Sequence, residues 1–522
     1  MPASGLGNAD FGMRFPDKIS LTRGIEREAL RVDAAGDIAK TPHPESLGPA
    51  LTHPYITLDY AETLPELITP PFVDDVNGLL EFLANLHIWF YQAIRPQGEI
   101  LWNGSMPACI PSEQDIVIAR FGRSNIARMK EIYRTGLGYR YGKTMQMIAG
   151  VHYNLSIDDD FWRWRYPAMS EAPFSSVRSH GYMGLIRNFL RHQWLLVYLF
   201  GASPSICQSF LKERPSRLAR LSESTRYGTY ATSLRMSDIG YVNNAQTALN
   251  ISYNSVDTYI AGLEAAIRTP EPLYQKIGVV VDGEYRQLNA NILQIENEFY
   301  ASVRPKRTVR SGERPAKALT RAGVEYVEVR ALDLNPFAPL GISKAQVLFL
   351  DCFLLWCALN DSPALSCREI GENKDNLRRV VESGRQEELT LWRENREVRL
   401  VEEGQRIFDE LLKVAEYLER QPWAVTQSLN YTESLAELAS MVNRPDETLS
   451  AQALAVVQNC GSHVEGFLQL SRAATSAIER MKYTGSFCRD MQKVTQTARD
   501  KFEEVESQAQ MPFEQFLAAY FE

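Results

Sequence analysis

The sequence contains few cysteines and no motif that pairs them. Seven cysteines are spread over 522 residues without a CxxC pair, which indicates free thiols rather than a disulfide framework. Long apolar runs are also absent, because the most apolar stretch, 347–359 (VLFLDCFLLWCAL), is too short to cross a membrane and contains Asp351. The first residues show no apolar signal core. We therefore expect a cytoplasmic protein in a reducing compartment, without membrane contact.

The sequence also lacks an excess of basic residues. Lys and Arg number 56 against 64 Asp and Glu, so the formal net charge is −8. Nucleic acid is therefore not expected as a partner, because it is bound by strongly positive surfaces. The hydrophobic content of 45% and the charged content of 23% are those of an ordinary globular protein. At about 150 residues per domain, the length allows two or three domains, or one large domain with additions.

Glycine-rich nucleotide-binding motifs are missing as well. Residues 136–144 (GLGYRYGKT) end in the Gly-Lys-Thr of a phosphate-binding loop, but Leu137 stands where that motif needs its first glycine. The chain has no GxGxxG fingerprint, so a dinucleotide cofactor is not supported. If ATP binds to this protein, a loop of the Walker type does not hold it.

Hydrophobic periodicity predicts a mixture of strands and helices. Alternating apolar and polar residues predict strands at 19–32, 55–59, 150–157, 287–300 and 323–332. Helical periodicity predicts helices at 75–95, 114–135, 183–200, 258–268 and 344–359. After about residue 373 the pattern is that of charged amphipathic helices, for example 400–420 and 449–480. We expect an α+β domain with an antiparallel sheet at 1–343 and a mostly helical region at 344–522 that packs on it.

Two glutamates lie two residues apart on the first predicted strand. In residues 19–32 (ISLTRGIEREALRV), Glu26 and Glu28 project to the same side, because side chains of an extended chain alternate between faces. The same face is expected to carry Thr22, Gly24, Leu30 and Val32. Such a pair is, by itself, more often a solvated outer face than a binding site.

Other predicted strands repeat this pattern of one polar face. Alternation groups His152 with Asn154 and Ser156, Glu328 with Tyr326 and Arg330, and Glu296 with Glu298 and Tyr300. Clustered carboxylates raise one another's pKa unless cations keep them ionised. Magnesium prefers oxygen ligands and commonly binds together with substrate phosphates. The recurrence therefore favours a metal–nucleotide site, in which the histidine indicates either manganese tolerance or an indirect role.

Several stretches, in order from Arg23 to Phe337, resemble a known family. They are RGIEREALRV, ALTHPYITLDYAE with ELITP, MQMIAGVHYNLS, YLFGASPSIC, YATSLRMSDIGY, LQIENEFYASVRPKR and GVEYVEVRALDLNPF. The chain resembles the proteobacterial glutamate-cysteine ligases, also called gamma-glutamylcysteine synthetases. This resemblance implies a fold of the glutamine synthetase-like superfamily, in which a curved and mainly antiparallel sheet forms an active-site funnel within the 1–343 catalytic domain.

The resemblance also implies a reaction and its residues. ATP would activate the gamma-carboxylate of glutamate as a gamma-glutamyl phosphate, which the amine of cysteine attacks, in the first step of glutathione biosynthesis. The implied cofactor is Mg²⁺, with Mn²⁺ as a second choice, and the implied metal ligands are Glu26, Glu28, Asp59, Glu66, His152 and Glu328. The implied catalytic residues are Arg330, which also contacts the nucleotide, and Arg235, which pairs with a substrate carboxylate. The implied cysteine pocket consists of Tyr60, Tyr133, Leu137, Gln146, Tyr241 and Tyr300.

Two alternatives stay open. One is a related carboxylate-amine ligase with a different amine acceptor, since pocket residues rather than metal ligands set that choice. The other is a non-catalytic metal-binding or regulatory protein that keeps the fold. The resemblance further implies feedback inhibition by glutathione and a monomeric protein.

Overall fold

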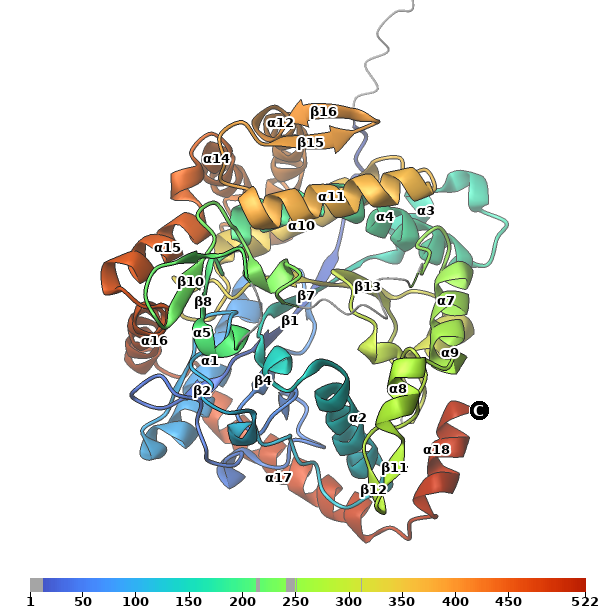
Figure 1. The fold of residues 1–522 in the computed structure, drawn as a ribbon. Coiled ribbons are helices and arrows are strands. Elements are labelled where there is room, and N and C mark those ends of the chain that lie inside the picture. Colours follow the sequence, from blue (N-terminus) through green and yellow to red (C-terminus); the bar gives the residue numbers. More distant parts are fainter. Residues whose placement is uncertain (1–12, 213–215, 241–248, 250, 311) are drawn as a thin grey trace, which may run out of the picture.

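A seven-stranded antiparallel sheet lies at the centre of the molecule, with helices around it (Figure 1). The computed structural model describes residues 13–522 except 213–215, 241–248, 250 and 311. The strand order is β13-β14-β7-β1-β4-β3, and β5 pairs with β1. The strands are β1 Leu21–Glu28, β3 Ile56–Leu58, β4 Pro65–Ile68, β5 Phe72–Val73, β7 Val151–Ile157, β13 Val303–Lys306 and β14 Tyr326–Leu332.

The two faces of this sheet differ in polarity. The register sets Glu26 opposite His152 and Glu28 opposite Glu66, so these side chains share one face. On the other face, Ile25, Leu155 and Val327 are fully buried in the main core. Helices α4 Phe174–Phe200, α10 Lys344–Leu359 and α14 Tyr431–Val442 contribute to the same core. Helices therefore cover one face, and the acidic face stays available for a site.

The covered face also contains a buried ion pair. Nε of Arg23 on β1 lies 2.9 Å from Oδ1 of Asp351 on α10, and neither side chain is exposed. Tyr153 and Tyr431 donate their hydroxyls to the same carboxylate, each at 2.7 Å. Because a buried charge is tolerated only when it is paired and hydrogen-bonded, this network fixes the position of α10 on the sheet.

Three of the five predicted strands match observed strands directly: β3, β7 and β14 lie within 55–59, 150–157 and 323–332. The first predicted strand is divided, because β1 ends at Glu28 and β2 Arg31–Val32 pairs with β6 Ile100–Leu101 in a separate small sheet. Leu30 and Val32 lie beyond the end of β1 and are fully buried. Their burial does not show which face they occupy, so the expectation that they share the face of Glu26 stays a prediction.

The predicted strand at 287–300 is also wrong. Its last part is a 3-10 turn, Glu296–Glu298, and the strand β13 starts only at Val303. The two glutamates do not share a strand face, because Glu296 accepts a hydrogen bond from Arg314 and Glu298 from Arg140. Strand β4 is not among the predicted strands. Its first residue is Pro65, and proline is tolerated at the first position of a strand, where its missing N–H is not needed.

The predicted helices are confirmed with shifts at some ends. Helix α10 matches 344–359, while α1 Val76–Ile94 and α7 Val256–Arg268 are within two residues of prediction. Helix α2 Asn125–Tyr141 begins later than predicted, because residues 113–115 form a separate 3-10 turn. Helix α4 begins at Phe174 rather than 183, directly after Pro173.

The region 344–522 is mostly helical, as expected. Helix α12 Leu400–Glu419 matches prediction, whereas 449–480 is divided into α15 Leu449–Cys460 and α16 His463–Arg480 by Gly461 in a left-handed conformation. A hairpin of β15 Thr390–Arg393 and β16 Arg396–Arg399 interrupts the helices. The order of helices and strands along the chain does not test whether a domain boundary lies between residues 343 and 344, so this boundary stays a prediction.

The described part of the chain also forms further helices and short strands. They are α3 Asp159–Arg165, α5 Gln208–Leu211, β8 Ser205–Cys207, β9 Ala219–Arg220, β10 Thr225–Tyr227, α8 Pro272–Ile277, β11 Val280–Val281, β12 Glu284–Tyr285, α9 Pro315–Ala322, α11 Cys367–Ser383, α13 Pro422–Thr426, α17 Phe487–Ser507 and α18 Phe513–Phe521. Among the described residues, none of the helices has the length and apolar character needed to cross a membrane.

Candidate active site

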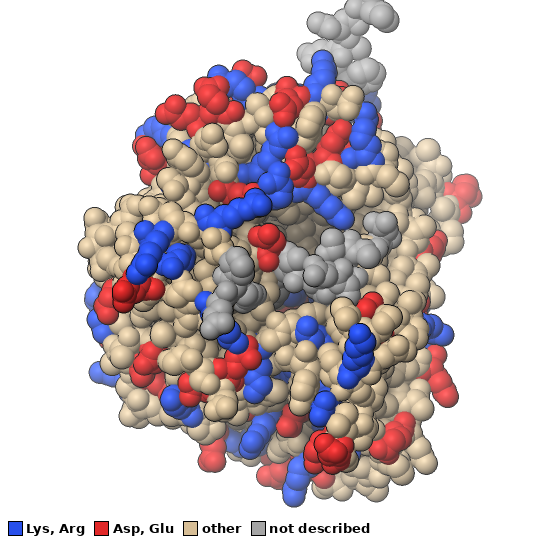
Figure 2. Space-filling view, in the orientation of Figure 1, with Lys and Arg blue, Asp and Glu red and all other residues tan. Residues whose placement is uncertain are grey.

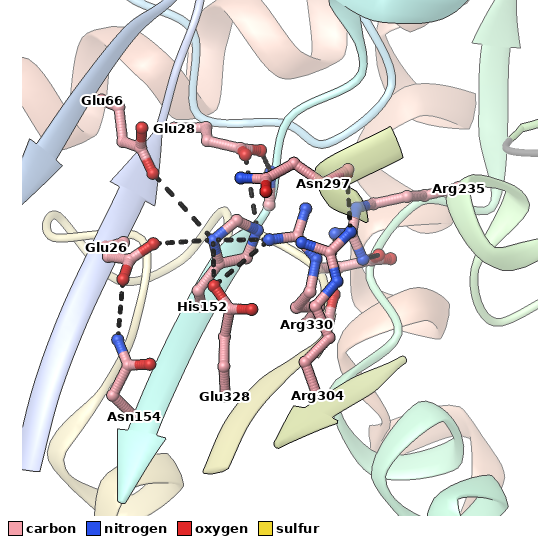
Figure 3. Close-up of polar contacts among 12 residues, drawn as sticks. Glu26, Glu28, Glu66, His152, Asn154, Arg235, Asn297, Arg304, Glu328 and Arg330 are labelled. Carbon is pink, nitrogen blue, oxygen red and sulfur yellow. Dashed lines mark hydrogen bonds and ion pairs between the residues drawn. The ribbon is translucent and has the colours of Figure 1, made fainter. Parts of the chain in front are cut away.

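Four strands bring acidic side chains and one imidazole together on the open face of the sheet (Figure 3). Glu26 and Glu28 come from β1, Glu66 from β4, His152 from β7 and Glu328 from β14. These strands are neighbours in the sheet, and side chains opposite each other in register lie about 5 Å apart at their Cβ atoms. The alternation seen in the sequence therefore converges on one point.

His152 lies at the centre of these carboxylates. Its Nδ1 is 3.1 Å from Oε2 of Glu26, 3.8 Å from Oε1 of Glu328 and 4.0 Å from Oε1 of Glu66. Its Nε2 is 3.4 Å from Oε1 of Glu28. Two sets of ligand atoms, each within 4.8 Å of one another, share the imidazole: Glu26 with His152 and Glu328, and Glu28 with Glu66 and His152.

The donor set fits a divalent cation. Nε2 of His152 and Oε2 of Glu328 are buried and make no hydrogen bond within the described part of the chain. Since buried polar atoms are nearly always bonded, these atoms are suited to a ligand that the protein itself does not supply. Carboxylate oxygens are the ligands that Mg²⁺ prefers, and an imidazole is also compatible with Mn²⁺.

The carboxylates on the side of β4 are hard to ionise without a cation. Burial, together with the nearby charges of Glu26 and Glu28, raises the pKa of Glu66 well above its usual value. Burial and Glu28 raise the pKa of Asp59 to about 6. Like charges in a buried site disfavour one another's ionised form. A bound cation would offset this repulsion.

Basic residues surround the opposite side of the site. Nη1 of Arg330 and Nζ of Lys306 lie 3.3 and 3.4 Å from Oε1 of Glu328. Burial opposes ionisation of Glu328, but the charges of Lys306 and Arg330 outweigh it and hold the pKa of Glu328 well below its usual range. Arg304 pairs with Glu328 across β13 and β14, on the same face. The site is therefore acidic toward β1 and β4 and basic toward β13.

A cavity of about 140 Å³ adjoins the acidic residues. It is lined by Glu28, Asp59 and Arg330 and by five of the predicted cysteine-pocket residues, namely Tyr60, Tyr133, Leu137, Gln146 and Tyr300. The sixth, Tyr241, lies outside the described residues. Figure 2 shows this face of the molecule hollowed above β7 and β13, with Lys and Arg side chains along one rim.

Asp59 takes a different place from the other predicted metal ligands. It follows β3 and lines the cavity beside Glu28, but it is in neither set of atoms around His152. Arg134 of α2 donates to the backbone carbonyls of Asp59 and Leu58. The helix thereby fixes the chain at the point where the strand ends.

Arg235 is buried next to Arg330, one of the residues that line the cavity. Its side chain is 2% exposed, and it is not among the described residues that line the cavity. Its Nη2 donates to the carbonyl of Arg330 at 2.8 Å. The guanidinium lies on Gly150, where an added Cβ would be 2.3 Å from Nη2. The N–H of Gly150 in turn donates to Oε2 of Glu28 at 2.8 Å, which joins the two groups.

Several residues of the site were not selected from the sequence. Asn154 donates to Oε1 of Glu26 at 2.9 Å, and Arg304 donates to the carbonyl of Asn297 at 2.9 Å. Alternation in the stretch VRPK places Arg304 and Lys306 on one face of a strand, so the sequence contains a pattern from which these two site residues could be predicted. Tyr141, which lines the cavity from α2 and donates to Glu298, had no such signal because this contact joins remote segments. Glu298 was grouped with Tyr300 by alternation, but it reaches the cavity from a turn.

Comparisons with known proteins identify the family. The glutamate-cysteine ligase family matches residues 18–380, a range that contains every predicted site residue. The chain belongs to the glutamate-cysteine ligase family. It is 45% identical over 511 residues to the glutamate–cysteine ligase of Alcanivorax borkumensis, covering 96% of this chain and 95% of that protein. It is 46% identical over 468 residues to that of Hahella chejuensis, covering 88% of each.

Solved structures agree with this assignment as a glutamate-cysteine ligase. The crystal structure of the Francisella tularensis enzyme in complex with AMP aligns with a TM-score of 0.90 and 35% identity over 97% of this chain and 98% of that one. A bifunctional glutathione synthetase from Pasteurella multocida aligns with a TM-score of 0.69 and 26% identity, over 93% of this chain and 56% of that one. The predicted family and the α+β fold with an antiparallel sheet and a helical C-terminal region are thus confirmed.

Proposed function

We propose that this chain joins the gamma-carboxylate of L-glutamate to the amine of L-cysteine with ATP, through a gamma-glutamyl phosphate. This reaction is the first step of glutathione synthesis, as membership of the glutamate-cysteine ligase family indicates. The observation that carries the proposal is the convergence of Glu26, Glu28, Glu66 and Glu328 on His152, beside a small cavity. The AMP bound to the Francisella tularensis relative supports a nucleotide as co-substrate.

The polar face of the sheet is proposed as the wall of an active-site funnel, as in the glutamine synthetase-like superfamily. Helices cover the opposite face, so the substrates approach from the side of Glu26 and His152. His152 belongs to both sets of ligand atoms, and a neutral imidazole has one free lone pair, so it would bind one divalent cation together with either Glu26 and Glu328 or Glu28 and Glu66. The carboxylates of the other set would hold a second cation without it. Asp59 stays a proposed ligand for the cation near Glu28. When bound, Mg²⁺ neutralises the triphosphate charge and aligns the transferred phosphate, and Mn²⁺ is an acceptable substitute.

The basic side of the funnel is proposed to bind the transferred phosphate. Arg330, Arg304 and Lys306 lie on one face of β13 and β14, where their fixed positive charges meet negative charge that develops on the phosphate oxygens. Such preorganised charge costs no rearrangement during the reaction. No covalent intermediate with the enzyme is required, so these residues act by position and charge.

The cavity is proposed to take the amine acceptor. A volume of about 140 Å³ is small compared with typical ligand pockets of about 300–1,000 Å³. Tyr60, Tyr133, Leu137, Gln146 and Tyr300 line it, and Tyr241 is proposed as a further member. This size favours cysteine over bulky amines and argues against a ligase with a larger acceptor. Arg235 is proposed to pair with a substrate carboxylate, as a planar bidentate donor can.

The test is phosphate release by purified protein with ATP and Mg²⁺. We expect release that requires both glutamate and cysteine, with 2-aminobutyrate as a weaker substitute for cysteine and no turnover of bulkier amines. Preferred turnover of a bulky amine would favour the alternative ligase. Binding of Mg²⁺-ATP without turnover would favour a non-catalytic protein.

Two further properties are proposed from the family resemblance. Glutathione is expected to inhibit phosphate release, which is checked by adding it at fixed glutamate. The protein is expected to be a monomer of 59.2 kDa, which is checked by light scattering of the purified protein.

A further inference from the structure

Asp333 is a buried carboxylate directly after β14, three residues beyond Arg330. It is 1% exposed, yet it accepts three hydrogen bonds from segments remote in sequence. The N–H of Ala202 and Oγ of Ser203 donate to Oδ2 at 2.8 and 2.6 Å. Oγ of Ser233 donates to Oδ1 at 2.9 Å. Three segments of the chain therefore meet at the Asp333 carboxylate. They are the residues that follow α4, the residues that precede Arg235, and the residues that follow β14.

The same carboxylate faces Arg235. Its Oδ1 lies 3.8 Å from Nη1 of Arg235, with neither side chain more than 2% exposed. Ser203, which donates to Asp333, also accepts from the backbone N–H of Arg235 at 3.3 Å. Ser233 caps the short turn Leu234–Met236 that contains Arg235. Asp333 is thus connected both to the guanidinium of Arg235 and to the backbone that carries it.

The guanidinium is held from the other side as well. Nη2 of Arg235 donates to the carbonyl of Arg330, and Gly150 leaves just enough room for the planar group. An arginine in such a buried place needs a nearby negative charge, because an uncompensated buried cation is costly. Among the described residues, Asp333 supplies this negative charge in an ion pair with Arg235.

We propose that Asp333 is a positioning residue that holds Arg235 in the orientation needed to bind a substrate carboxylate. This inference rests on the proposed role of Arg235. At 3.8 Å the pair acts through charge rather than through a direct hydrogen bond, while the two serines set the backbone. Because the guanidinium of Arg235 is already held in place, less conformational entropy is lost when the substrate binds.

The decisive variant is Asp333→Asn. This change keeps the shape of the side chain but removes the negative charge beside Arg235. It also replaces one carboxylate oxygen by an NH2 group, which cannot accept a hydrogen bond from the N–H of Ala202 or attract the guanidinium of Arg235. We expect the KM of one amino-acid substrate to rise at least ~10-fold, with the KM of ATP within about twofold, since only one carboxylate contact is weakened. Arg235→Lys should raise the KM of the same amino acid, and the double variant should be less than additive.

Asp351→Asn is the matched control. Asp351 is also a fully buried aspartate that pairs with an arginine and accepts hydroxyl hydrogen bonds, but it lies on the covered face of the sheet. We expect this variant to lose thermal stability while all three KM values stay unchanged. This separates a loss of fold stability from a loss of positioning.

The possible outcomes are distinct. The inference is overturned if Asp333→Asn leaves both amino-acid KM values unchanged while Arg235→Lys raises one of them. It is also overturned if Asp333→Asn raises the KM of ATP as much as the KM of the amino acid. It also falls if Arg235→Lys has no effect on either amino acid. If Asp333→Asn does not fold, Ser233→Ala replaces it, because this change removes one hydrogen bond and keeps the charge; the same KM should rise by a smaller factor. Wild-type protein without glutamate- and cysteine-dependent phosphate release contradicts the proposed function itself.

Discussion

Glu328 is the residue at which the acidic and basic halves of the site meet. It is 1% exposed, lies within 4 Å of His152, and contacts both Lys306 and Arg330. We expect Glu328→Ala to lower turnover at least ~100-fold, because a proposed metal ligand and the partner of two cations are lost together. Phosphate release measures the activity, and circular dichroism checks that the variant is folded.

Glu325→Ala is the control for this change. Glu325 lies three residues earlier, is partly exposed, and accepts from the N–H of Thr308 rather than from the site. It should keep turnover close to wild type. A Glu328→Ala protein that has lost its helical signal would show that the residue supports the fold instead.

Gly150 separates Glu28 from Arg235 and leaves no room for a side chain. A Cβ at this position would lie 2.3 Å from Nη2 and 2.7 Å from Cζ of Arg235, so the guanidinium must move in Gly150→Ala. We expect the KM of the substrate bound by Arg235 to rise by ~10-fold or more, equivalent to about 1.4 kcal/mol. Steady-state kinetics with each substrate varied in turn would measure it.

Gly371→Ala is the matched glycine change. Gly371 lies in α11, where an added Cβ meets no atom within 4 Å. This variant should keep all kinetic constants, and its melting temperature should rise slightly, because alanine favours a helix interior over glycine by about 1 kcal/mol. Equal kinetics in the two alanine variants would contradict the steric argument.

At the scale of elements, the contact between β1 and α10 depends on the Arg23–Asp351 pair. Both side chains are fully buried, so removal of one charge leaves the other without compensation. We expect Asp351→Asn to lower the free energy of unfolding by about 3–5 kcal/mol. Urea unfolding measures this loss. Asp160→Asn, which breaks an exposed pair with Arg163, should cost less than about 1 kcal/mol.

The start of α16 carries a histidine that is kept neutral. His463 is fully buried, with Nδ1 2.9 Å from Oγ of Ser205, and burial lowers its pKa from 6.5 to about 4. As the pH falls below 6.5, the unfolded chain takes up a proton that the folded chain does not. Stability is therefore full above pH 6.5 and is lost toward pH 4, by at most roughly 3 kcal/mol from this group.

His463→Gln should therefore flatten the loss of stability between pH 7 and pH 5, as measured by urea unfolding at both values. His180→Gln should change that slope less, because His180 is exposed although partial burial also lowers its pKa. An identical slope in wild type and His463→Gln would show that the proton uptake occurs elsewhere.

For the whole molecule, metal binding should contribute to stability, because the site joins four strands of the central sheet. A cation removes the repulsion among Glu26, Glu28 and Glu66, and any ligand specific for the folded state raises its stability. We expect Mg²⁺ to raise the melting temperature of the wild type by several degrees and EDTA to reverse the rise. Glu28→Gln should show a clearly smaller rise in a calorimetric scan. A melting temperature that does not respond to Mg²⁺ would argue against the metal site.

Some parts of the fold and site could be predicted from sequence and others could not. The polar faces of β1, β7 and β14 follow from strict alternation, which is a local property of an extended chain. Strand β4 is short and begins with Pro65, so it lacked a local pattern, although it supplies Glu66. The segment 287–300 alternates like a strand but turns at Glu296–Glu298, because remote arginines bind its acids. There, tertiary contacts overrode the local pattern.

The amino-acid sequence by itself determined the family, the order of the motifs and the direction in which Glu26, Glu28, His152 and Glu328 project, since these depend on residue type and on short-range periodicity. Only the tertiary structure decided which side chains meet. It brought Tyr133 and Leu137 of α2 together with Tyr300 in the lining of one cavity, and it paired Arg23 with Asp351, 328 residues away. It also brought Asp333 to Arg235. Alternation specifies a face, whereas partners of buried charges are selected by the packing of remote segments, which no local pattern encodes.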